Sequence, residues 1–432
     1  MERKRVAILG GGPAGLALAG SLAGVEGLEI DLVEKSARIG GLQHSVECEG
    51  LHFDIGTFLY FDNHGLFNAF PQIKPLFVPI TYTPTSIFPS GKIGAYPFTV
   101  RQFLNDNGLL AAIRAGIDLC ASKLICHRDT SASEFARYYI GDTIYQRSGL
   151  ANYIHRLHDV SGDEIDAKFA RERMPFLSRL SLRKMLRKLL PGTTPRVKTN
   201  QYYVRPAEGI PAVYGPILNE LKSRGVNVLL GSELKSIRRQ GSGFVVEGNH
   251  TGFYDKIVST IPISDMLALI GLKPETNIES RGLISLFYRG EISPQSSILF
   301  NFSFEGAWKR VTVFSRFYGP AENGDDYFTV EITSDDFTLE NIERLRLEFE
   351  KESLRHNICE KAPRFLNYYL TRHAYPVFRR GGTPGVEREK QRIVDFGIEL
   401  LGRQGNFEYQ ISDWVAKRAV EKGKELAGFF RR

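Results

Sequence analysis

Clustered cysteines, long apolar runs and metal-ligand patterns are missing from this sequence, and each absence argues against a class of protein. The four cysteines among 432 residues, Cys48, Cys120, Cys126 and Cys359, are scattered without a CxxC pair. We therefore expect no disulfide framework and no metal site, and we expect a reduced, cytoplasmic setting. No uninterrupted apolar stretch reaches the roughly 18 residues of a transmembrane helix. The charged residues 2–5 precede an apolar run too short for a signal peptide.

The composition is that of an ordinary folded protein. Hydrophobic residues make up 42% and charged residues 24% of the chain, which is enough for two substantial cores rather than one. The net charge of +7 fits either a merely soluble basic protein, which charge alone favours, or a protein attracted to an anionic substrate or surface. No nucleic-acid-binding motif is evident, so nucleic acid is not an expected partner. The oligomeric state is left open.

The first 35 residues have the order of a dinucleotide-binding βαβ unit. An apolar run at 6–9 ends in the segment 10–15 (GGGPAG), and a second apolar run ends in Glu34-Lys35. Gly10 permits a tight turn, Gly12 lets backbone N–H groups approach a pyrophosphate, and Gly15 lets the helix pack closely on the strand. Glu34, about 20 residues after the glycines, is placed to accept a hydrogen bond from a ribose hydroxyl. We therefore predict a nucleotide site here.

A second glycine pair, Gly40-Gly41, follows shortly after Glu34-Lys35. A simple nicotinamide dehydrogenase has no need of glycines at this point, whereas a flavin dinucleotide requires close backbone approach along its extended chain. Further on, the segment 53–57 (FDIGT) would bring another backbone turn near the flavin ring. The pattern therefore favours FAD as the cofactor.

At this point the chain resembles the flavin-containing amine oxidase superfamily, which includes protoporphyrinogen oxidase, phytoene desaturase-like enzymes and UDP-galactopyranose mutase. The matching blocks run from end to end: GGGPAGL at 10–16, EKSARIGGL at 34–42, FDIG at 53–56, GKIGAYPF at 91–98, IVSTIP at 257–262 and LLGRQGNFEYQISD at 400–413. The resemblance implies an α/β protein, with a Rossmann-type FAD-binding domain and an inserted α+β substrate domain of antiparallel sheet and helices. It also implies an enzyme that binds FAD.

The resemblance further implies which residues hold the cofactor. They lie in the two glycine motifs, after the buried strands and in the carboxy-terminal block: Gly10, Gly12, Pro13, Ala14, Gly15, Glu34, Lys35, Gly41, Leu42, Gly56, Thr57, Leu234, Thr260, Gly402, Arg403, Asp413, Trp414 and Val415. For Asp413 the alternative is an N-cap of the last helix, and for Asp54 it is the cap of a turn.

The expected domains are discontinuous. Residues 1–70, 205–265 and 376–432 are predicted to form the FAD-binding domain, because nucleotide-domain patterns return after a long interruption. Residues 71–204 and 266–375 are predicted to form the substrate-binding domain, which includes a helical segment.

Several elements can be predicted from periodicity. The segment 101–158 is predicted to be mostly helical, because apolar residues recur near helical spacing at Phe103, Leu109, Leu110, Ile113, Ile117 and Leu124. Residues 256–262 form a predicted buried strand, and 283–335 alternate in strand fashion. Residues 179–190 have the pattern of a basic amphipathic helix, which packs on its own domain or, less favoured, lies on an acidic membrane surface. Two aromatic groups could line a pocket or pack in a core: Tyr202 and Tyr203 with Arg205, and Tyr368 with Tyr369.

Two arginines suggest an anionic substrate. The segment 309–315 (KRVTVFS) looks like the mutase-type strand whose arginine, here Arg310, meets a substrate diphosphate. Arg173 lies in a segment that could supply a second arginine. Paired guanidinium groups suit a diphosphate because the planar fork forms two hydrogen bonds at once. Surface or ion-pair roles are the alternative for both residues.

The block after Gly56 argues against the mutase reaction. The mutases place a histidine after this glycine, whereas this chain has no histidine until His64. Tyr60 would point near the flavin if the block aligns, and the core is its alternative. We therefore expect an FAD-dependent oxidoreductase that transfers hydride from an unidentified small molecule to flavin N5. A redox-neutral mutase acting on a nucleotide sugar and a membrane-associated, non-catalytic flavin-binding protein are the alternatives.

Overall fold

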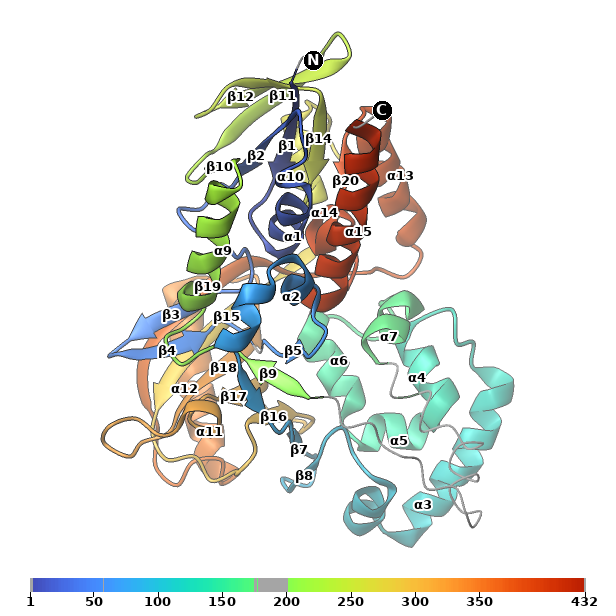
Figure 1. Ribbon diagram of the computed structural model, residues 1–432. Helices are drawn as coiled ribbons and strands as arrows, with labels where there is room; N and C mark the ends of the chain where they lie inside the picture. The colour runs from blue at the N-terminus through green and yellow to red at the C-terminus, as the bar shows by residue number, and fades with distance from the viewer. Residues whose placement is uncertain (1–2, 57, 175–176, 178–200, 431–432) are drawn as a thin grey trace, which may run out of the picture.

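A parallel five-stranded sheet of order β10-β2-β1-β14-β20 forms the centre of the upper part of the molecule in Figure 1. The computed structural model describes residues 3–56, 58–174, 177 and 201–430. The strands of this sheet are β1 (Lys4–Leu9), β2 (Leu28–Val33), β10 (Val226–Leu229), β14 (Lys256–Ser259) and β20 (Glu399–Leu400). Segments far apart in the sequence therefore lie side by side, and β1 lies between β2 and β14.

Both faces of this sheet are covered, as expected for parallel strands. Val6 and Ile8 of β1 pack with the helices α1 (Pro13–Leu22), α9 (Pro211–Ser223) and α15 (Ser412–Phe430). Ala7 and Leu9 point the other way, because side chains alternate along a strand, and pack with α10 (Ile263–Leu269) and α13 (Thr383–Asp395). The strands β11 (Leu234–Gln240), β12 (Gly243–Gly248) and β13 (Gly252–Tyr254) form a separate antiparallel sheet on this side.

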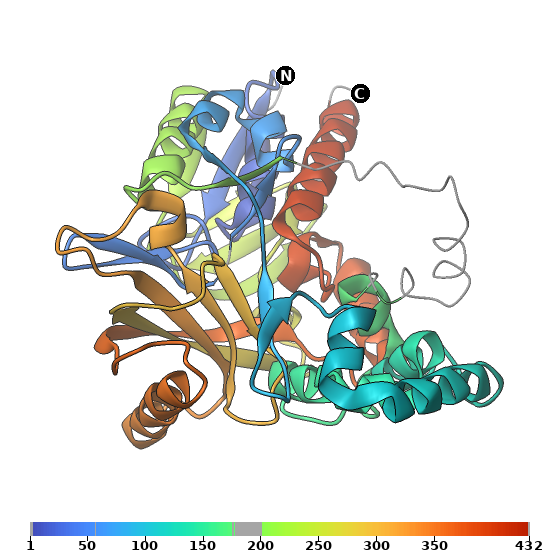
Figure 2. The same ribbon diagram turned by 90° about the horizontal axis from the view of Figure 1, so that it is seen from below.

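A second, seven-stranded sheet of order β19-β15-β18-β17-β16-β7-β8 lies below the first (Figures 1 and 2). Its strands are β7 (Thr85–Ile87), β8 (Ile93–Ala95), β15 (Ser280–Arg289), β16 (Ile298–Asn301), β17 (Trp308–Val313), β18 (Tyr327–Thr333) and β19 (Arg364–Pro376). One face packs on α12 (Leu339–Arg355) through Ile342, Leu345 and Phe349. Apart from the parallel β16–β7 pair, the pairings in this sheet are antiparallel.

Short elements connect the two sheets. The hairpin of β3 (Ser45–Cys48) and β4 (Leu51–Asp54) packs on the second sheet through Phe53. A three-stranded sheet of order β5-β9-β6 lies between them, with strands β5 (Tyr60–Phe61), β6 (Val78–Ile80) and β9 (Tyr202–Val204). The remaining short helices are α2 (Gly65–Ala69), a 3-10 helix (Pro71–Leu76), α11 (Ser315–Tyr318) and α14 (Gly402–Gly405).

A helical lobe extends to one side of the second sheet (Figure 2). It contains α3 (Val100–Ile125), α4 (Ala132–Ile140), α5 (Asp142–Arg147), α6 (Leu150–His158) and α7 (Ala167–Arg173). The helical prediction for 101–158 is therefore confirmed. Most of the apolar residues on α3 from which the helix was predicted are exposed, however. The inward face of α3 is instead made of smaller side chains such as Ala111 and Ala115.

The mixed α/β fold class, with a Rossmann-type sheet and a second, mainly antiparallel sheet, is confirmed. The strand predicted at 256–262 ends at Ser259, just before Thr260. The strand pattern at 283–335 is confirmed, with the short helix α11 inserted. The predicted basic helix at 179–190 lies outside the described residues. Among the residues that the model covers, no helix is long and apolar enough to cross a membrane.

Candidate functional site

The first glycine motif forms a turn with no room for side chains. Gly10 has φ +104°, and a Cβ atom on it would lie 2.3 Å from the Thr260 hydroxyl oxygen. A Cβ atom on Gly15 would lie 1.9 Å from the Gly10 carbonyl oxygen. Gly12 directly precedes α1 and leaves the N-terminal N–H groups of that helix uncovered by a side chain. The arrangement is that of a strand–turn–helix anion site.

The second glycine motif lies against the first. A Cβ atom on Gly41, which has φ +55°, would lie 3.1 Å from the Gly12 Cα atom. The Gly40 N–H donates to the Gly11 carbonyl oxygen over 2.8 Å. Leu42 is half-buried beside this contact. The two glycine motifs, about 30 positions apart in sequence, therefore form one backbone surface. An extended ligand can approach this surface closely because glycines carry no side chains.

The carboxy-terminal block closes the same turn from the other side. A Cβ atom on Gly402 would lie 2.9 Å from the Ala14 Cβ atom, 3.7 Å from that of Thr260 and 3.9 Å from a Val415 methyl group. Four of the predicted cofactor residues, from three distant segments, are thus brought together. We call the surface formed by Gly10, Gly12, Gly15, Gly41 and Gly402 the glycine cradle.

Glu34 lies at the end of β2, beside the cradle. Its carboxylate accepts hydrogen bonds from the backbone N–H groups of Gly11 (2.7 Å) and Ser36 (2.8 Å). Each carboxylate oxygen has a further lone pair, so Glu34 can still accept from a hydroxyl group. Its side chain is held in position before any ligand binds.

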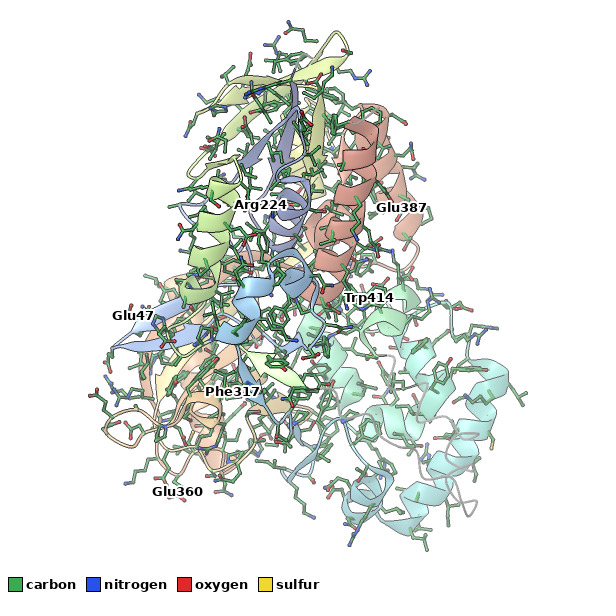
Figure 3. All side chains as sticks on the ribbon, viewed as in Figure 1. Glu47, Arg224, Phe317, Glu360, Glu387 and Trp414 are labelled. Carbon is green, nitrogen blue, oxygen red and sulfur yellow. The ribbon has the colours of Figure 1, made fainter. Side chains whose placement is uncertain are left out.

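Other predicted cofactor residues lie at the margins of the cradle. Lys35 is exposed and forms an ion pair with Glu233 over 2.8 Å, next to Leu234 at the start of β11. Trp414 is 60% exposed and lies at the start of α15 (Figure 3). Gly56 is buried, Pro13 is the first residue of α1, and Thr57 lies outside the described residues.

Asp413 links two helices instead of capping its own. Its carboxylate accepts from the Gly65 N–H at the start of α2 and from the Lys417 ammonium group, both over 2.9 Å. The predicted N-cap alternative is therefore replaced by a tie between α15 and α2. A role in cofactor binding stays a prediction for this residue.

Tyr60 and His64 are parts of the core. Tyr60 is 1% exposed, packs on Phe67 and Phe77, and donates its hydroxyl hydrogen to Gln43 over 3.0 Å. His64 accepts from the Leu66 N–H through Nδ1 and so caps α2. Burial lowers the pKa of His64 to about 4, so it stays neutral. A catalytic role for Tyr60 stays a prediction, and its burial does not favour it.

A second group of side chains lies next to the cradle, over the seven-stranded sheet. It comprises four cations and four tyrosines, all at least half-buried, which we call the cation–tyrosine cluster: Arg173, Lys309, Arg310, Arg403, Tyr96, Tyr153, Tyr375 and Tyr409. The guanidinium carbon of Arg403 lies 4.5 Å from the Tyr409 ring centroid and 5.2 Å from that of Tyr375. Arg403 directly follows Gly402, so the cluster adjoins the cradle.

The three arginines of the cluster interact electrostatically with a common set of tyrosines. The Arg173 guanidinium carbon lies 5.6 Å from the Tyr409 ring centroid, and interaction with Tyr409 raises the pKa of Arg173. Burial raises the pKa of Tyr375, and the positive charges of Arg310, Arg403 and Arg173 oppose this increase. The predicted pair Arg173 and Arg310 is therefore brought to one region, with Arg403 as a third member.

A β-bulge directs Lys309 and Arg310 to the same carboxylate. The pairing of β17 with β18 shifts between Trp308 and Arg310, and such an extra residue re-aims the side chains around it. Arg310 donates to both Glu331 oxygens over 2.7 Å, and the Lys309 ammonium nitrogen lies 3.4 Å from Glu331. Neighbours on a regular strand would point to opposite faces.

Lys309 also contacts Tyr375, which lies three strands away in the sheet order. The Lys309 nitrogen donates to the Tyr375 hydroxyl oxygen over 2.6 Å. Burial lowers the pKa of Lys309 to about 7, although the Glu331 charge acts in the opposite direction. This lysine can therefore gain or lose a proton near neutral pH. The sequence offered no signal for the position of Lys309 in the cluster, because that position depends on the bulge in β17.

Two arginines of the cluster keep buried nitrogen atoms without protein partners. Within the part of the chain that the structure describes, Arg173 Nε and Arg403 Nε and Nη2 have no hydrogen-bond acceptor. An unsatisfied buried donor costs about 1–3 kcal/mol. A bound anion would supply the missing acceptors.

A buried ion pair supports the region between the two sheets, and sequence analysis missed it. Arg205 is fully buried and donates from Nε to Asp54 over 2.7 Å and from Nη2 to the His52 carbonyl oxygen over 2.6 Å. The expectation that Arg205 lines a pocket is therefore corrected, because its donors are used inside the core. The alternative that Asp54 only caps a turn is corrected by the same contact.

The cradle fits a dinucleotide. A pyrophosphate needs uncovered backbone N–H groups at a helix start, which Gly12 provides, and a ribose needs an acceptor, which Glu34 provides. The added surface at Gly41 and Gly402 allows a longer ligand to continue toward the cation–tyrosine cluster. No group of His, Cys, Asp or Glu among the described residues is placed to hold a metal ion.

Comparison with known proteins agrees with this geometry. A model of the NAD(P)-binding Rossmann-like domain matches residues 8–73. No curated protein matches the chain significantly in sequence.

Solved structures match almost the whole chain. A reduced UDP-galactopyranose mutase superposes with a TM-score of 0.80 at 18% identity, over 99% of this chain and 95% of that one. A protein from Exiguobacterium sp. 255-15, with protoporphyrinogen oxidase as its suggested activity, superposes with a TM-score of 0.75 at 16% identity. The match covers 98% of this chain and 100% of that one. A redesigned putrescine oxidase superposes with a TM-score of 0.63 at 14% identity, over 99% of this chain and 98% of that one. This chain therefore has the fold of the group that its sequence blocks resemble, with a Rossmann-type dinucleotide-binding domain.

Proposed function

We propose that this chain is an FAD-dependent oxidoreductase that acts on a small anionic molecule. The observation that carries the proposal is the position of the cation–tyrosine cluster, which begins at Arg403, one residue after the cradle glycine Gly402. A ligand that follows the cradle would end beside three buried arginines and a lysine. The substrate bound there would have to carry negative charge.

Glu34, Gly12 and Gly41 would hold the FAD ribose and pyrophosphate, as their geometry permits. When bound, FAD supplies a hydride acceptor, which is chemistry that no side chain can provide. Gly402 lets the carboxy-terminal block pack closely on Ala14 and Thr260, beside the proposed cofactor site. The protein's own part is to orient the substrate and to handle its proton.

Arg403 and Arg173 are the proposed anion-binding residues. Both have buried nitrogen donors without an acceptor among the described residues, and both flank the Tyr409 ring. A carboxylate or phosphate would accept two hydrogen bonds from one guanidinium fork. Arg310 is less free to do so, because Nε and Nη2 are used by Glu331.

Lys309 and Tyr375 are the proposed proton acceptors. Removing a hydride from a C–H group next to an O–H or N–H group leaves a proton to be taken up. That proton would pass to the Tyr375 oxygen as the Tyr375 hydroxyl proton passes to the neutral Lys309 nitrogen, which lies 2.6 Å away. Since the pKa of Lys309 is about 7, substrate oxidation is expected to accelerate as pH rises through 7.

The first experiment is to load the purified protein with FAD and to measure flavin reduction without oxygen. The compounds offered are amines, sugar nucleotides, steroids and polyisoprenoid diphosphates. We expect reduction by anionic compounds, and we expect Arg403→Gln to raise the substrate Kd at least tenfold while Arg355→Gln, on the exposed end of α12, leaves it unchanged. Failure to take up FAD, or equally fast reduction by neutral compounds, would contradict the proposal.

A redox-neutral mutase acting on a nucleotide sugar is the second candidate. It is favoured by the convergence of Arg173 and Arg310 on common tyrosines and by the fold shared with a UDP-galactopyranose mutase. The use of the Arg310 fork by Glu331 and the capping role of His64 argue against it. A mutase would convert UDP-galactopyranose only after reduction with dithionite, and would need no electron acceptor. Turnover that is equal or faster with oxidised flavin would eliminate this candidate.

A further inference from the structure

We infer that the outer face of α3 is a docking surface for a second copy of this chain. The helix lies at the outer edge of the helical lobe in both views (Figures 1 and 2). It is kinked at Gly108, which has φ +77°. The part after the kink, residues 109–125, carries an apolar stripe that nothing in the described chain covers. This inference is independent of the proposed function.

The stripe has the spacing of a helix–helix seam. Its residues recur at alternating intervals of three and four: Leu110, Ile113, Ile117, Cys120 and Leu124. This is the a/d pattern by which one helix packs against another, and it is narrower than the apolar face of an ordinary surface helix. The opposite face of α3 is used inside the lobe, where Ala111, Ala115 and Leu119 are buried. The stripe is therefore not needed for folding of the lobe.

The exposed area is large enough for a stable contact. The exposed fractions are 72% for Leu109, 85% for Leu110, 54% for Ile113, 65% for Ile117, 88% for Leu124 and 72% for Ile125. With roughly 100 Å² or more of each side chain open, these six offer an apolar area on the order of 600–800 Å², near the roughly 800 Å² per partner of a standard interface. Apolar patches of this size on soluble proteins mark interaction sites.

A second copy fits the stripe because the stripe is self-complementary in an antiparallel arrangement. With Ile117 on the two-fold axis, Leu110 meets Leu124 of the second copy and Ile113 meets its Cys120. Every apolar residue then has an apolar partner, as a two-fold interface requires. Gly116, whose Cβ position is open, allows the helices to approach closely beside the axis.

The charges on α3 are compatible with this arrangement. Arg114 and Lys123 flank the stripe on its two opposite sides. In the antiparallel pair, Arg114 lies near the position of Cys120 and Lys123 near that of Ala111. Two like charges therefore do not meet.

The test is the mass of the full-length protein in solution. Light scattering after gel filtration at 1–50 μM should give twice the 48.6 kDa of one chain. Ile117→Glu should lower the dimer affinity at least a hundredfold, whereas Leu347→Glu, at an equally exposed position on α12, should not change it. Both variants should keep the wild-type circular dichroism spectrum and Tm, which excludes misfolding as the cause.

A disulfide tests the orientation directly. Ile113→Cys should cross-link with Cys120 of the second copy under mild oxidation, and the additional change Cys120→Ser should abolish the cross-link. A wild-type protein that stays at 48.6 kDa over the whole concentration range would overturn the inference. A monomer that floats with phosphatidylglycerol vesicles would identify a lipid surface as the occupant instead. A monomer that does not float would likewise overturn the inference.

Discussion

The glycine cradle and the cation–tyrosine cluster adjoin each other, yet they are built by opposite means. The cradle is made of backbone, and its function depends on atoms that are missing: a Cβ atom on Gly15 would overlap the Gly10 carbonyl oxygen. The cluster is made of long side chains from α6, α7, β17, β19, α14 and the segments that follow β8 and α14, and its function depends on charges that are present. We conclude that the cradle is sensitive to added volume and that the cluster is sensitive to a lost charge.

The largest effect is expected from added volume in the cradle. Gly15→Val should abolish FAD binding and destabilise the protein by about 3 kcal/mol, because its first side-chain carbon would lie 1.9 Å from a backbone oxygen. Bound FAD is measured by absorbance and stability by urea unfolding. The control Gly215→Ala, at an open position in α9, should stabilise the helix by up to about 1 kcal/mol. Normal FAD binding by Gly15→Val would refute the steric account of the cradle.

The next effect is expected from a lost charge in the cluster. Glu331→Gln should cost about 3–5 kcal/mol, because it leaves Lys309 and Arg310 buried without a counter-charge. Urea unfolding at pH 7 measures the loss. Glu343→Gln removes an exposed partner of Arg346 and should cost less than about 1 kcal/mol. Equal losses in the two variants would mean that the cluster is as solvated as the surface.

The pH dependence of stability isolates Lys309. The folded-state pKa of about 7 lies below the ordinary lysine value of 10.5, so between these values the unfolded chain binds more protons than the folded one. The free energy of unfolding of the wild type should therefore rise with pH in this window, relative to that of Lys309→Met. Below pH 7 and above pH 10.5 the difference should be constant. Urea unfolding at pH 6, 7, 8 and 9 would measure it, and a flat difference would exclude a shifted lysine.

The smallest effect is expected from a charge at the cradle. Glu34→Gln keeps the size of the side chain and one acceptor oxygen, so the hydrogen bond from Gly11 can persist. We expect FAD affinity to fall about tenfold, in line with one weakened charge-assisted hydrogen bond. Fluorescence titration with FAD gives the Kd. A loss as complete as that of Gly15→Val would show that charge matters as much as volume in the cradle.

The two regions also differ in how far they could be predicted from the sequence. The cradle follows from local rules, because a glycine that must lie close to other backbone is recognisable by its spacing. Gly10, Gly15 and Gly41 could therefore be placed, and even the meeting of Gly402 with Ala14 followed from the resemblance of its block. Fold class could be predicted for the same reason, from apolar runs of strand length and helical periodicity.

The cluster could be predicted only in part, because it depends on tertiary contacts. Arg173 and Arg310 were found through the resemblance, but Lys309 and Tyr375 were not. Their contact depends on a bulge in β17 and on the order of strands in the sheet, and neither leaves a local signal. Arg205 and Asp54 show the same limit, since a buried ion pair looks like two ordinary charged residues. Periodicity likewise predicted the helix α3, but it did not indicate which side of the helix is buried.

The order of strands in the parallel sheet has a consequence for synthesis. β1 and β2 leave the ribosome first, but their neighbour β14 begins at residue 256, and β20 and Gly402 follow near residue 400. At roughly 5–20 residues per second, tens of seconds separate the first strand from its last partners. The nascent amino-terminal segment therefore waits with unpaired strand edges, and no cofactor can be captured until translation is almost complete.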